Sequence, residues 1–261
     1  MLGKFIFRGA NIAYSTKGKG RAIVLIHGFL GAKEIWNEYQ SRLAKNFQVI
    51  CIDLPGHGKS ACIGYVHNME LLAACVKQLL KQLNKRKAII IGHSLGGYVG
   101  LAFAEMHPEA VLGLILINST ANGDSKAKVS SRNQLIELVK KDKSRAIDLL
   151  VPTFFSHKTR KTGWQIKSYL KMAQHCSEQA IIATIEGMKI RKEREILLKF
   201  APFRFHYIIS ENDSILPSNQ LIAETEIGEN GSYTIIEDSS HMSIMDKKEQ
   251  VFRVIKTFSK Q

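Results

Sequence analysis

The chain has few cysteines, few acidic residues and no long apolar run, and each shortage excludes a class of protein. Only 4 of its 261 residues are cysteines, and none stands in a Cys-X-X-Cys spacing, so neither a disulfide framework nor a zinc site is expected. No apolar run approaches the roughly 18–20 residues that cross a bilayer. The first residues are too soon interrupted by charge to form a signal peptide. We therefore expect a cytoplasmic protein with reduced thiols and no membrane span.

Acidic residues are outnumbered by basic ones, with 23 Asp and Glu against 37 Lys and Arg and a net charge of +14. Such a surface can attract nucleic acid, an anionic membrane or an acidic protein. The basic residues are dispersed and no nucleic-acid-binding motif is present, so we expect no nucleic-acid partner. The simplest interpretation is a basic enzyme whose lysines and arginines are solvated. An acidic protein partner stays open.

Apolar, β-branched runs predict the fold class. A chain with 45% hydrophobic residues is long enough for one large α/β domain with an inserted subdomain. Several runs are continuously apolar, which is typical of strands buried on both faces of a parallel sheet. The predicted strands are residues 4–8, 11–16, 22–26, 48–52, 88–91, 111–117, 204–210 and 233–236. We predict a mostly parallel, eight-stranded α/β sheet flanked by helices.

Residues 121–195 differ in character, because strand-like runs give way to helical patterns and 16 Lys and Arg accompany 8 Asp and Glu. We interpret this segment as a helical cap, with helices at 133–140, 145–150, 164–176 and 179–188, inserted into a core made of residues 1–120 and 196–261. A cap over the strand ends would shape an apolar pocket and exclude water. The candidate pocket residues are Phe29, Phe154, Phe155, Trp164, Tyr169, Met172 and Met242. For those of the cap, packing within the cap is an equally good interpretation.

The stretch 89–97, Ile-Ile-Ile-Gly-His-Ser-Leu-Gly-Gly, carries the strongest chemical signal. A Gly-X-Ser-X-Gly pattern between a buried strand and a helix is typical of a nucleophile elbow. The sharp turn strains the backbone at Ser94, and glycine is needed two positions to either side because a side chain would collide with the neighbouring strand or helix. Ser94 would then stand at a helix N-terminus, where free N–H groups stabilise developing negative charge.

A nucleophilic serine needs a base, and the base needs a carboxylate that fixes its tautomer. Parallel strands end at one edge of a sheet, and two later strands are followed there by Asp213 and His241. Glu211 is a rival for the acid but sits nearer the strand itself, whereas Asp238 shares the loop of His241 and is expected to be solvated. The order Ser, Asp, His is the one found with this elbow. We predict Ser94, Asp213 and His241 as a catalytic triad.

Residues 27–31, His-Gly-Phe-Leu-Gly, follow a buried strand, and glycine there lets backbone amides approach a substrate closely. We expect the N–H groups of Phe29 and Leu95 to form a two-donor oxyanion hole. An ordinary strand-to-helix turn is the alternative. Four other polar residues near these motifs are interpreted as structural: His27, Asp53, His57 and His93.

These segments together give the chain a resemblance to the α/β-hydrolase fold superfamily, in particular to its small, lid-bearing serine esterases and acyl hydrolases. The matching segments are His-Gly-Phe-Leu-Gly at 27–31, Asp-Leu-Pro-Gly-His-Gly-Lys-Ser at 53–60, Gly-His-Ser-Leu-Gly-Gly at 92–97, Asn-Asp-Ser-Ile-Leu-Pro at 212–217 and Ser-His at 240–241. The resemblance implies a serine hydrolase that cleaves a small carboxylic ester or thioester through an acyl-enzyme, with no cofactor or metal.

Departures from the sequence patterns of related subfamilies narrow the choice of subfamily. Serine rather than aspartate at position 94 argues against epoxide hydrolases and haloalkane dehalogenases. Tyr98 stands where the menaquinone-synthesis enzymes of this fold usually carry arginine, and residues 27–31 lack the Gly-Pro-Gly turn typical of ring-fission C–C hydrolases and proline iminopeptidases. Three alternatives stay open: an ester hydrolase acting on an acidic acyl carrier protein, which the basic cap would suit, a C–C hydrolase, and a ligand receptor that retains the triad. Substrate identity and oligomeric state are not predicted.

Overall fold

The computed structural model describes residues 1–156 and 163–261 and contains an eight-stranded sheet in the order β1-β2-β4-β3-β5-β6-β7-β8. β2 pairs antiparallel with both β1 and β4, and the other neighbours are parallel. The strands are β1 (Leu2–Phe7), β2 (Ala10–Lys17), β3 (Ala22–Ile26), β4 (Gln48–Ile52), β5 (Ala88–His93), β6 (Val111–Ile117), β7 (Phe205–Ser210) and β8 (Gly231–Ile236). The predicted mostly parallel, eight-stranded sheet is confirmed.

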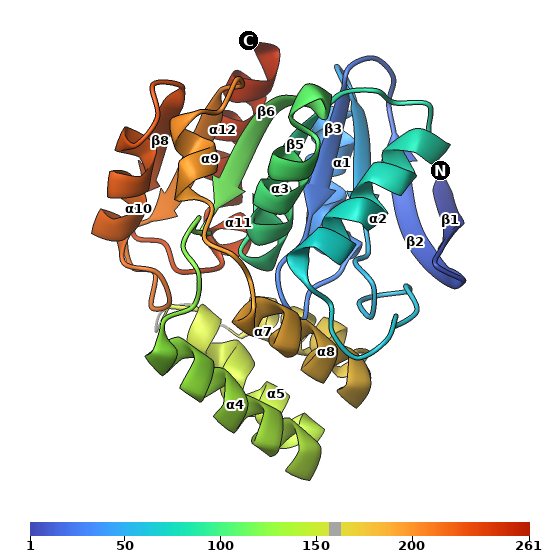
Figure 1. Ribbon diagram of the computed structural model, residues 1–261, viewed down its shortest axis with the longest axis vertical. Coiled ribbons are helices and arrows are strands. Elements are labelled where there is room, and N and C mark those ends of the chain that lie inside the picture. Colours follow the sequence, from blue (N-terminus) through green and yellow to red (C-terminus); the bar gives the residue numbers. More distant parts are fainter. Residues whose placement is uncertain (157–162) are drawn as a thin grey trace.

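Helices cover both faces of this sheet, which explains why its central strands are apolar throughout. Every residue of β3 and of β5 is buried. α2 (Met69–Gln82) and α3 (Leu95–Met106) pack together on one face, while α1 (Asn37–Leu43) and α12 (Lys248–Lys260) lie on the other (Figure 1). The Tyr39 ring of α1 lies 6.4 Å from the Phe252 ring of α12, which holds these two helices together. The remaining helices of the core are η1 (Lys33–Trp36), η2 (Pro108–Ala110), α10 (Ser218–Glu226) and α11 (Ser243–Asp246).

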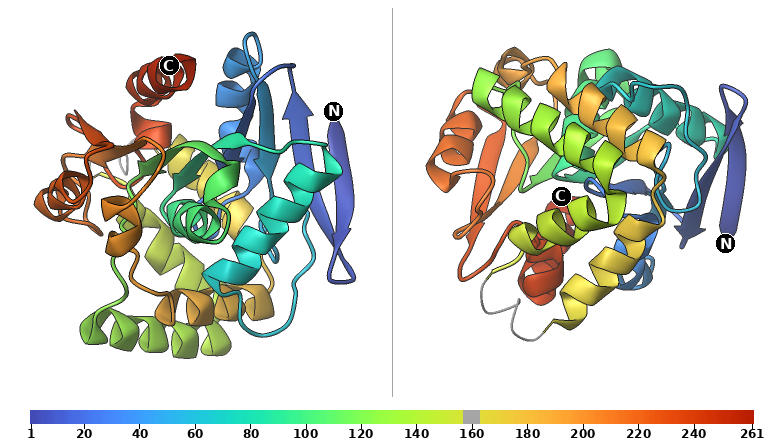
Figure 2. Two further views of the ribbon diagram at one scale, coloured as in Figure 1. Left: turned by 45° about the horizontal axis from the view of Figure 1, so that its top comes forward. Right: turned by 90° about the horizontal axis from the view of Figure 1, so that it is seen from below.

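A second group of helices lies between β6 and β7 in the sequence. It comprises α4 (Lys126–Lys141), α5 (Lys143–Leu150), η3 (Val151–Phe154), α7 (Trp164–Gln174), α8 (Glu178–Lys189) and α9 (Glu195–Lys199). α4, α5, α7 and α8, called here the inserted helices, form a layer beyond the strand ends toward which the β6 arrow points (Figure 1), and the view from below shows them lying across the sheet (Figure 2). The carboxyl ends of the parallel strands therefore face the inserted helices.

Two helical segments differ from the sequence pattern by more than two residues. α4 starts at Lys126 rather than at residue 133, because the Ser125 hydroxyl accepts the N–H of Lys128 at 3.3 Å and so caps a polar first turn that has no apolar period. The amphipathic pattern over residues 245–258 is divided between α11 and α12, because Lys247 has φ −129° and ψ 45°, outside the helical region. Across residues 1–156 and 163–261, no helix has the length and apolar character that a bilayer crossing requires.

Candidate active site

Ser94 occupies the sharp turn between β5 and α3, with φ 50° and ψ −114°. A side chain on Gly92 would place its Cβ 2.1 Å from the carbonyl oxygen of Gly96, and one on Gly96 would meet the carbonyl oxygen of Ile26 at 2.3 Å. Both contacts are with backbone, so only glycine fits at either position. The Ser119 hydroxyl donates to the carbonyl of Ser94 at 2.9 Å and helps to hold the strained residue in place.

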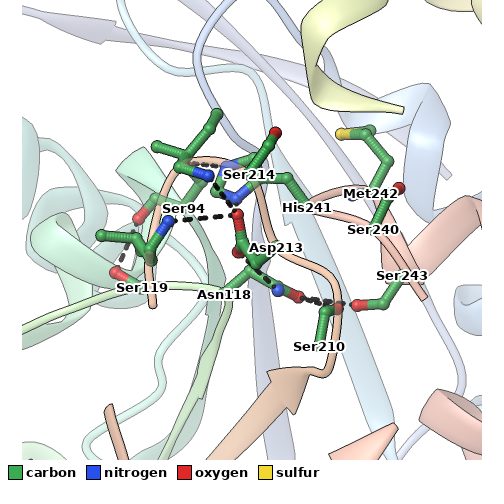
Figure 3. A network of polar contacts seen from close by, with 12 residues as sticks. Ser94, Asn118, Ser119, Ser210, Asp213, Ser214, Ser240, His241, Met242 and Ser243 are labelled. Atoms are coloured by element: carbon green, nitrogen blue, oxygen red, sulfur yellow. Dashed lines mark hydrogen bonds and ion pairs between the residues drawn. The ribbon is translucent and has the colours of Figure 1, made fainter. Parts of the chain in front are cut away.

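The Ser94 hydroxyl lies at the end of a hydrogen-bonded series that runs through His241 to Asp213 (Figure 3). Nε2 of His241 is 2.9 Å from Oγ of Ser94, and Nδ1 of His241 is 2.8 Å from Oδ2 of Asp213. An ionised carboxylate only accepts hydrogen bonds. The proton of a neutral His241 therefore resides on Nδ1, which leaves Nε2 as the acceptor for the serine proton. The structure thus brings the three predicted triad residues together.

The carboxylate of Asp213 is enclosed by donors on both oxygens. Oδ1 accepts the backbone N–H groups of Ile215 and Leu216 at 2.8 and 3.2 Å, and Oδ2 accepts Nδ2 of Asn118 at 2.8 Å as well as the His241 ring. Burial opposes the charged form of this unexposed side chain, but His241 and the surrounding donors outweigh that effect. The pKa of Asp213 is accordingly below its ordinary value.

Asn118 is a site residue that the sequence analysis missed. It follows β6 directly, is fully buried and has a left-handed backbone with φ 46°. While its amide nitrogen donates to Asp213, its Oδ1 accepts the hydroxyls of Ser210 and Ser243 at 3.2 and 2.7 Å (Figure 3). The available signal was a polar residue at the carboxyl end of a fully apolar strand, at the same sheet edge as Ser94.

Two backbone N–H groups beside Ser94 are free to donate. Neither the amide of Phe29 nor that of Leu95 donates to a backbone or side-chain acceptor in the described part of the chain. The loop that carries Phe29 is held from both sides: Gly31 donates its N–H to the carbonyl of Gly28 at 3.1 Å, and the hydroxyl of Tyr169 from α7 donates to the carbonyl of Phe29 at 2.7 Å. Both N–H groups thus lack an acceptor among the described residues, and the loop of Phe29 is fixed by two hydrogen bonds.

A cavity of about 290 Å³ opens beside Ser94 and His241, between the strand ends and the inserted helices. Four of the predicted pocket residues line it: Phe29, Phe154, Tyr169 and Met242. The ring of Phe154, at the end of η3, lies 5.9 Å from the ring of His241, so the segment between β6 and β7 contacts the predicted base itself. In residues 1–156 and 163–261, no three His, Cys, Asp or Glu side chains gather in a way that could hold a metal ion.

Residues 21–248 match the family model of the alpha/beta hydrolase fold. The chain belongs to the α/β-hydrolase fold family. This confirms the resemblance that the motifs carried. Among solved structures, a thermophilic esterase from Thermogutta terrifontis is 25% identical with a TM-score of 0.93, over all of this chain and 98% of that one. An enol-lactonase from Burkholderia xenovorans LB400 shares the fold at 19% identity and a TM-score of 0.92, over 99% of this chain and 100% of that one.

Curated relatives match parts of longer proteins. An uncharacterized protein of Mycobacterium tuberculosis is 38% identical over 111 residues, which are 42% of this chain and 33% of that protein. The dihydrolipoyllysine-residue acetyltransferase component of an acetoin cleaving system of Pseudomonas putida is 27% identical over 237 residues, 89% of this chain and 61% of that one. The chain thus spans about a third to three fifths of the length of these relatives.

The other carboxylates considered for the role of catalytic acid in this α/β hydrolase bind partners other than His241. Glu211 accepts the N–H of Asp238 through Oε2 at 2.8 Å, and the largely exposed Asp238 side chain pairs with Lys247. Asp53 is completely buried and binds the ammonium and the N–H of Lys33, each at 2.7 Å. In the described residues only Asp213 pairs with His241, so the geometry separates the predicted acid from its rivals.

Three histidines interpreted as structural surround the site of the α/β hydrolase and are buried. Nε2 of His93 lies 2.8 Å from the carbonyl oxygen of His241, to which it donates, while His27 contacts the carbonyl of Gly28 through Nδ1 and accepts the N–H of Leu54 through Nε2. Burial lowers the pKa of His27 to about 4 and the pKa values of His57 and His93 to about 3. They are therefore neutral at physiological pH and hold backbone rather than supply charge.

The other expected pocket residues lie outside the cavity. Phe155 is buried with its ring 6.2 Å from that of Tyr169, so it packs behind the cavity wall. Trp164 is 55% exposed and lines a separate hollow with Met172. The buried stripe of α7 contains Ile166, Tyr169 and Ala173, and Trp164 precedes Ile166 by two residues, which points it to the opposite side of the helix. Trp164 therefore lies on the exposed side of α7.

Proposed function

We propose that the chain is a serine hydrolase that cleaves carboxylic esters or thioesters through an acyl-enzyme on Ser94. The observation that carries the proposal is the hydrogen-bonded series from Ser94 through His241 to Asp213, open to a cavity of about 290 Å³. The family and the likeness to the Thermogutta terrifontis esterase support it. No cofactor is needed for this chemistry, because nucleophile, base and acid are all side chains.

In the first step, Oγ of Ser94 attacks the substrate carbonyl while Nε2 of His241 takes its proton. The distance of 2.9 Å between these atoms is that of a hydrogen bond along which the proton can move. The imidazolium that forms is stabilised by Asp213, whose pKa is held down by His241 and by the donors around it. The negative charge on the former carbonyl oxygen is stabilised by the free N–H groups of Phe29 and Leu95.

In the second step, the tetrahedral intermediate collapses and His241 gives its proton to the leaving alcohol or thiol. A water molecule then attacks the acyl-enzyme with the same imidazole as general base, and the imidazole passes the proton on to Oγ of Ser94 as the acid is released. Residues 121–195 act as a cap on the core made of 1–120 and 196–261. Its aromatic side chains Phe154 and Tyr169 restrict water around His241 and so strengthen the electrostatic interactions of the site.

Hydrolysis of 4-nitrophenyl butyrate by wild type, Ser94→Ala and Ser130→Ala tests the proposal. Ser130 is an exposed serine of α4 outside the cavity, which makes it a matched control. We expect Ser94→Ala to lose several orders of magnitude in kcat and to lose labelling by a fluorophosphonate probe, while Ser130→Ala retains both. Wild-type turnover by Ser94→Ala would refute the proposal. Labelling of Ser94 without turnover of any ester or thioester would instead favour a ligand receptor.

A further inference from the structure

Lys128 brings a positive charge to the wall of the cavity that contains Ser94. Lys128 is partly buried, and its Nζ donates to the carbonyl oxygen of Ile215 at 3.2 Å. Within residues 1–156 and 163–261, no carboxylate forms an ion pair with this ammonium. An ammonium carries three donors, so Lys128 retains donors for a ligand in the cavity.

The surroundings of Lys128 do not neutralise it. The buried carboxylate of Asp124 is shared between the guanidinium groups of Arg132 and Arg191, so three cations stand around one anion. Arg132 also lines the cavity, and Arg191 stacks over the ring of Tyr98 at 4.2 Å. Asp213 is the other carboxylate that acts on Lys128, and it already accepts four hydrogen bonds.

A partly buried ammonium without a counter-ion is unfavourable. Burial is the main reason that the pKa of Lys128 is below its ordinary value, and Arg132 adds to the effect. An anionic group in the cavity would supply the missing charge and would gain charge-assisted hydrogen bonds. The same cavity is also lined by the apolar side chains of Leu135, Leu150 and Met188, which suit a hydrocarbon segment between the anion and the ester.

We propose that Lys128 forms an anion subsite, and that the substrates of this hydrolase are esters that carry a carboxylate in addition to the scissile carbonyl. This rests on the proposed function, because it names the class of ester that Ser94 attacks. The carboxylate can belong to the acyl part or to the leaving part of the ester. The two sources share one chemistry at Lys128, and the choice of substrates separates them.

Two pairs of esters test the subsite. Mono-4-nitrophenyl adipate and 4-nitrophenyl hexanoate differ by a carboxylate on the acyl part, whereas 4-butyryloxybenzoate and its methyl ester differ by one on the leaving part. The variants are Lys128→Met, which keeps the length of the side chain, Lys128→Arg, which keeps its charge, and Lys126→Met. Lys126 is an exposed lysine of the same helix outside the cavity, so it controls for net charge.

For at least one pair, we expect Lys128→Met to lower kcat/KM for the carboxylate ester by about tenfold or more, mainly through KM, while the neutral ester changes by less than about twofold. Lys128→Arg and Lys126→Met should keep the wild-type ratio between the two esters. Equal losses on charged and neutral esters, or no loss on either carboxylate ester, would overturn the subsite. If the subsite fails this test, the proposed function still holds provided that wild type hydrolyses the neutral esters and Ser94→Ala does not. A wild type inactive on all four esters would contradict both.

Discussion

Replacing Asp213 by asparagine should remove most of the activity, because the site offers an amide group no suitable position. Four donors face the carboxylate: the N–H groups of Ile215 and Leu216 at Oδ1, and the side chains of His241 and Asn118 at Oδ2. The two backbone donors cannot become acceptors. The new amide nitrogen must therefore take the Oδ2 position and donate to Nδ1 of His241.

That hydrogen bond fixes the wrong tautomer of the imidazole. With Nδ1 as acceptor, the proton of a neutral His241 moves to Nε2, which lies 2.9 Å from Oγ of Ser94 and can then no longer accept the serine proton. The carboxylate charge that stabilises the imidazolium is lost as well. In serine proteases the equivalent change lowers kcat about 10⁴-fold, which corresponds to about 5.5 kcal/mol in activation free energy. We expect a loss of the same order for Asp213→Asn.

The assay is steady-state hydrolysis of 4-nitrophenyl butyrate near neutral pH, with Glu211→Gln as the matched control. Glu211 is two residues away, and its carboxylate accepts the N–H of Asp238 rather than a proton of His241. The same carboxylate-to-amide change should there leave kcat within about twofold of wild type. Circular dichroism and the midpoint of denaturation show that both variants fold. An Asp213→Asn protein within about tenfold of wild type, or a larger loss in Glu211→Gln, would refute this reasoning.

Three further predictions concern the support of the site. Tyr169→Phe removes the hydrogen bond to the carbonyl of Phe29 and should lower kcat roughly tenfold with little change in KM. This loss is smaller than that expected from removing an oxyanion-hole donor itself. A changed KM at constant kcat contradicts the prediction. Lys33→Met leaves Asp53 buried without its ion pair, so denaturant titration should show a loss of ~3–5 kcal/mol with normal kcat in the folded fraction; unchanged stability contradicts it. Lowering the pH from about 7.5 to about 5.5 should lower the free energy of unfolding by at least about 4 kcal/mol, and a flat profile contradicts it. That amount comes from His27, His57 and His93, whose folded-state pKa values of about 3 to 4 lie below 6.5, so that the unfolded chain takes up protons first. The lowered pKa values of His67 and His206 act in the same direction.

The sheet could be predicted because its signals are local. β3 and β5 are buried on both faces and read as unbroken apolar runs, and the elbow requires glycine on both sides of Ser94 for contacts with adjacent backbone. Predicted and observed strand bounds accordingly differ by few residues. α4 begins seven residues before its predicted start, because its first turns are polar and are specified by the cap at Ser125 rather than by an apolar period.

The residues of the site also differ in whether a local sequence signal predicts them. Ser94, Asp213 and His241 each follow a strand that runs in the same direction, and strands of a parallel sheet end at one edge. Their meeting therefore follows from the strand assignment alone. Asn118 satisfies the same rule and was still missed, because a single asparagine after a strand has no pattern of its own. Its role becomes visible only through its hydrogen bonds to Asp213, Ser210 and Ser243.

Side chains that come from the inserted helices follow no such rule. Which of them face the cavity depends on the phase of each helix and on the angle at which the helix crosses the strand ends, and sequence periodicity specifies only the phase. For α7 the phase alone would have excluded Trp164 and retained Tyr169. For α4 even the phase was hidden, because Lys128 lay outside the predicted helix. The nucleophile is thus encoded in a short motif, whereas the groups that choose its substrate depend on how α4 and α7 pack above it, so the chemistry of such a chain is easier to infer than its substrate.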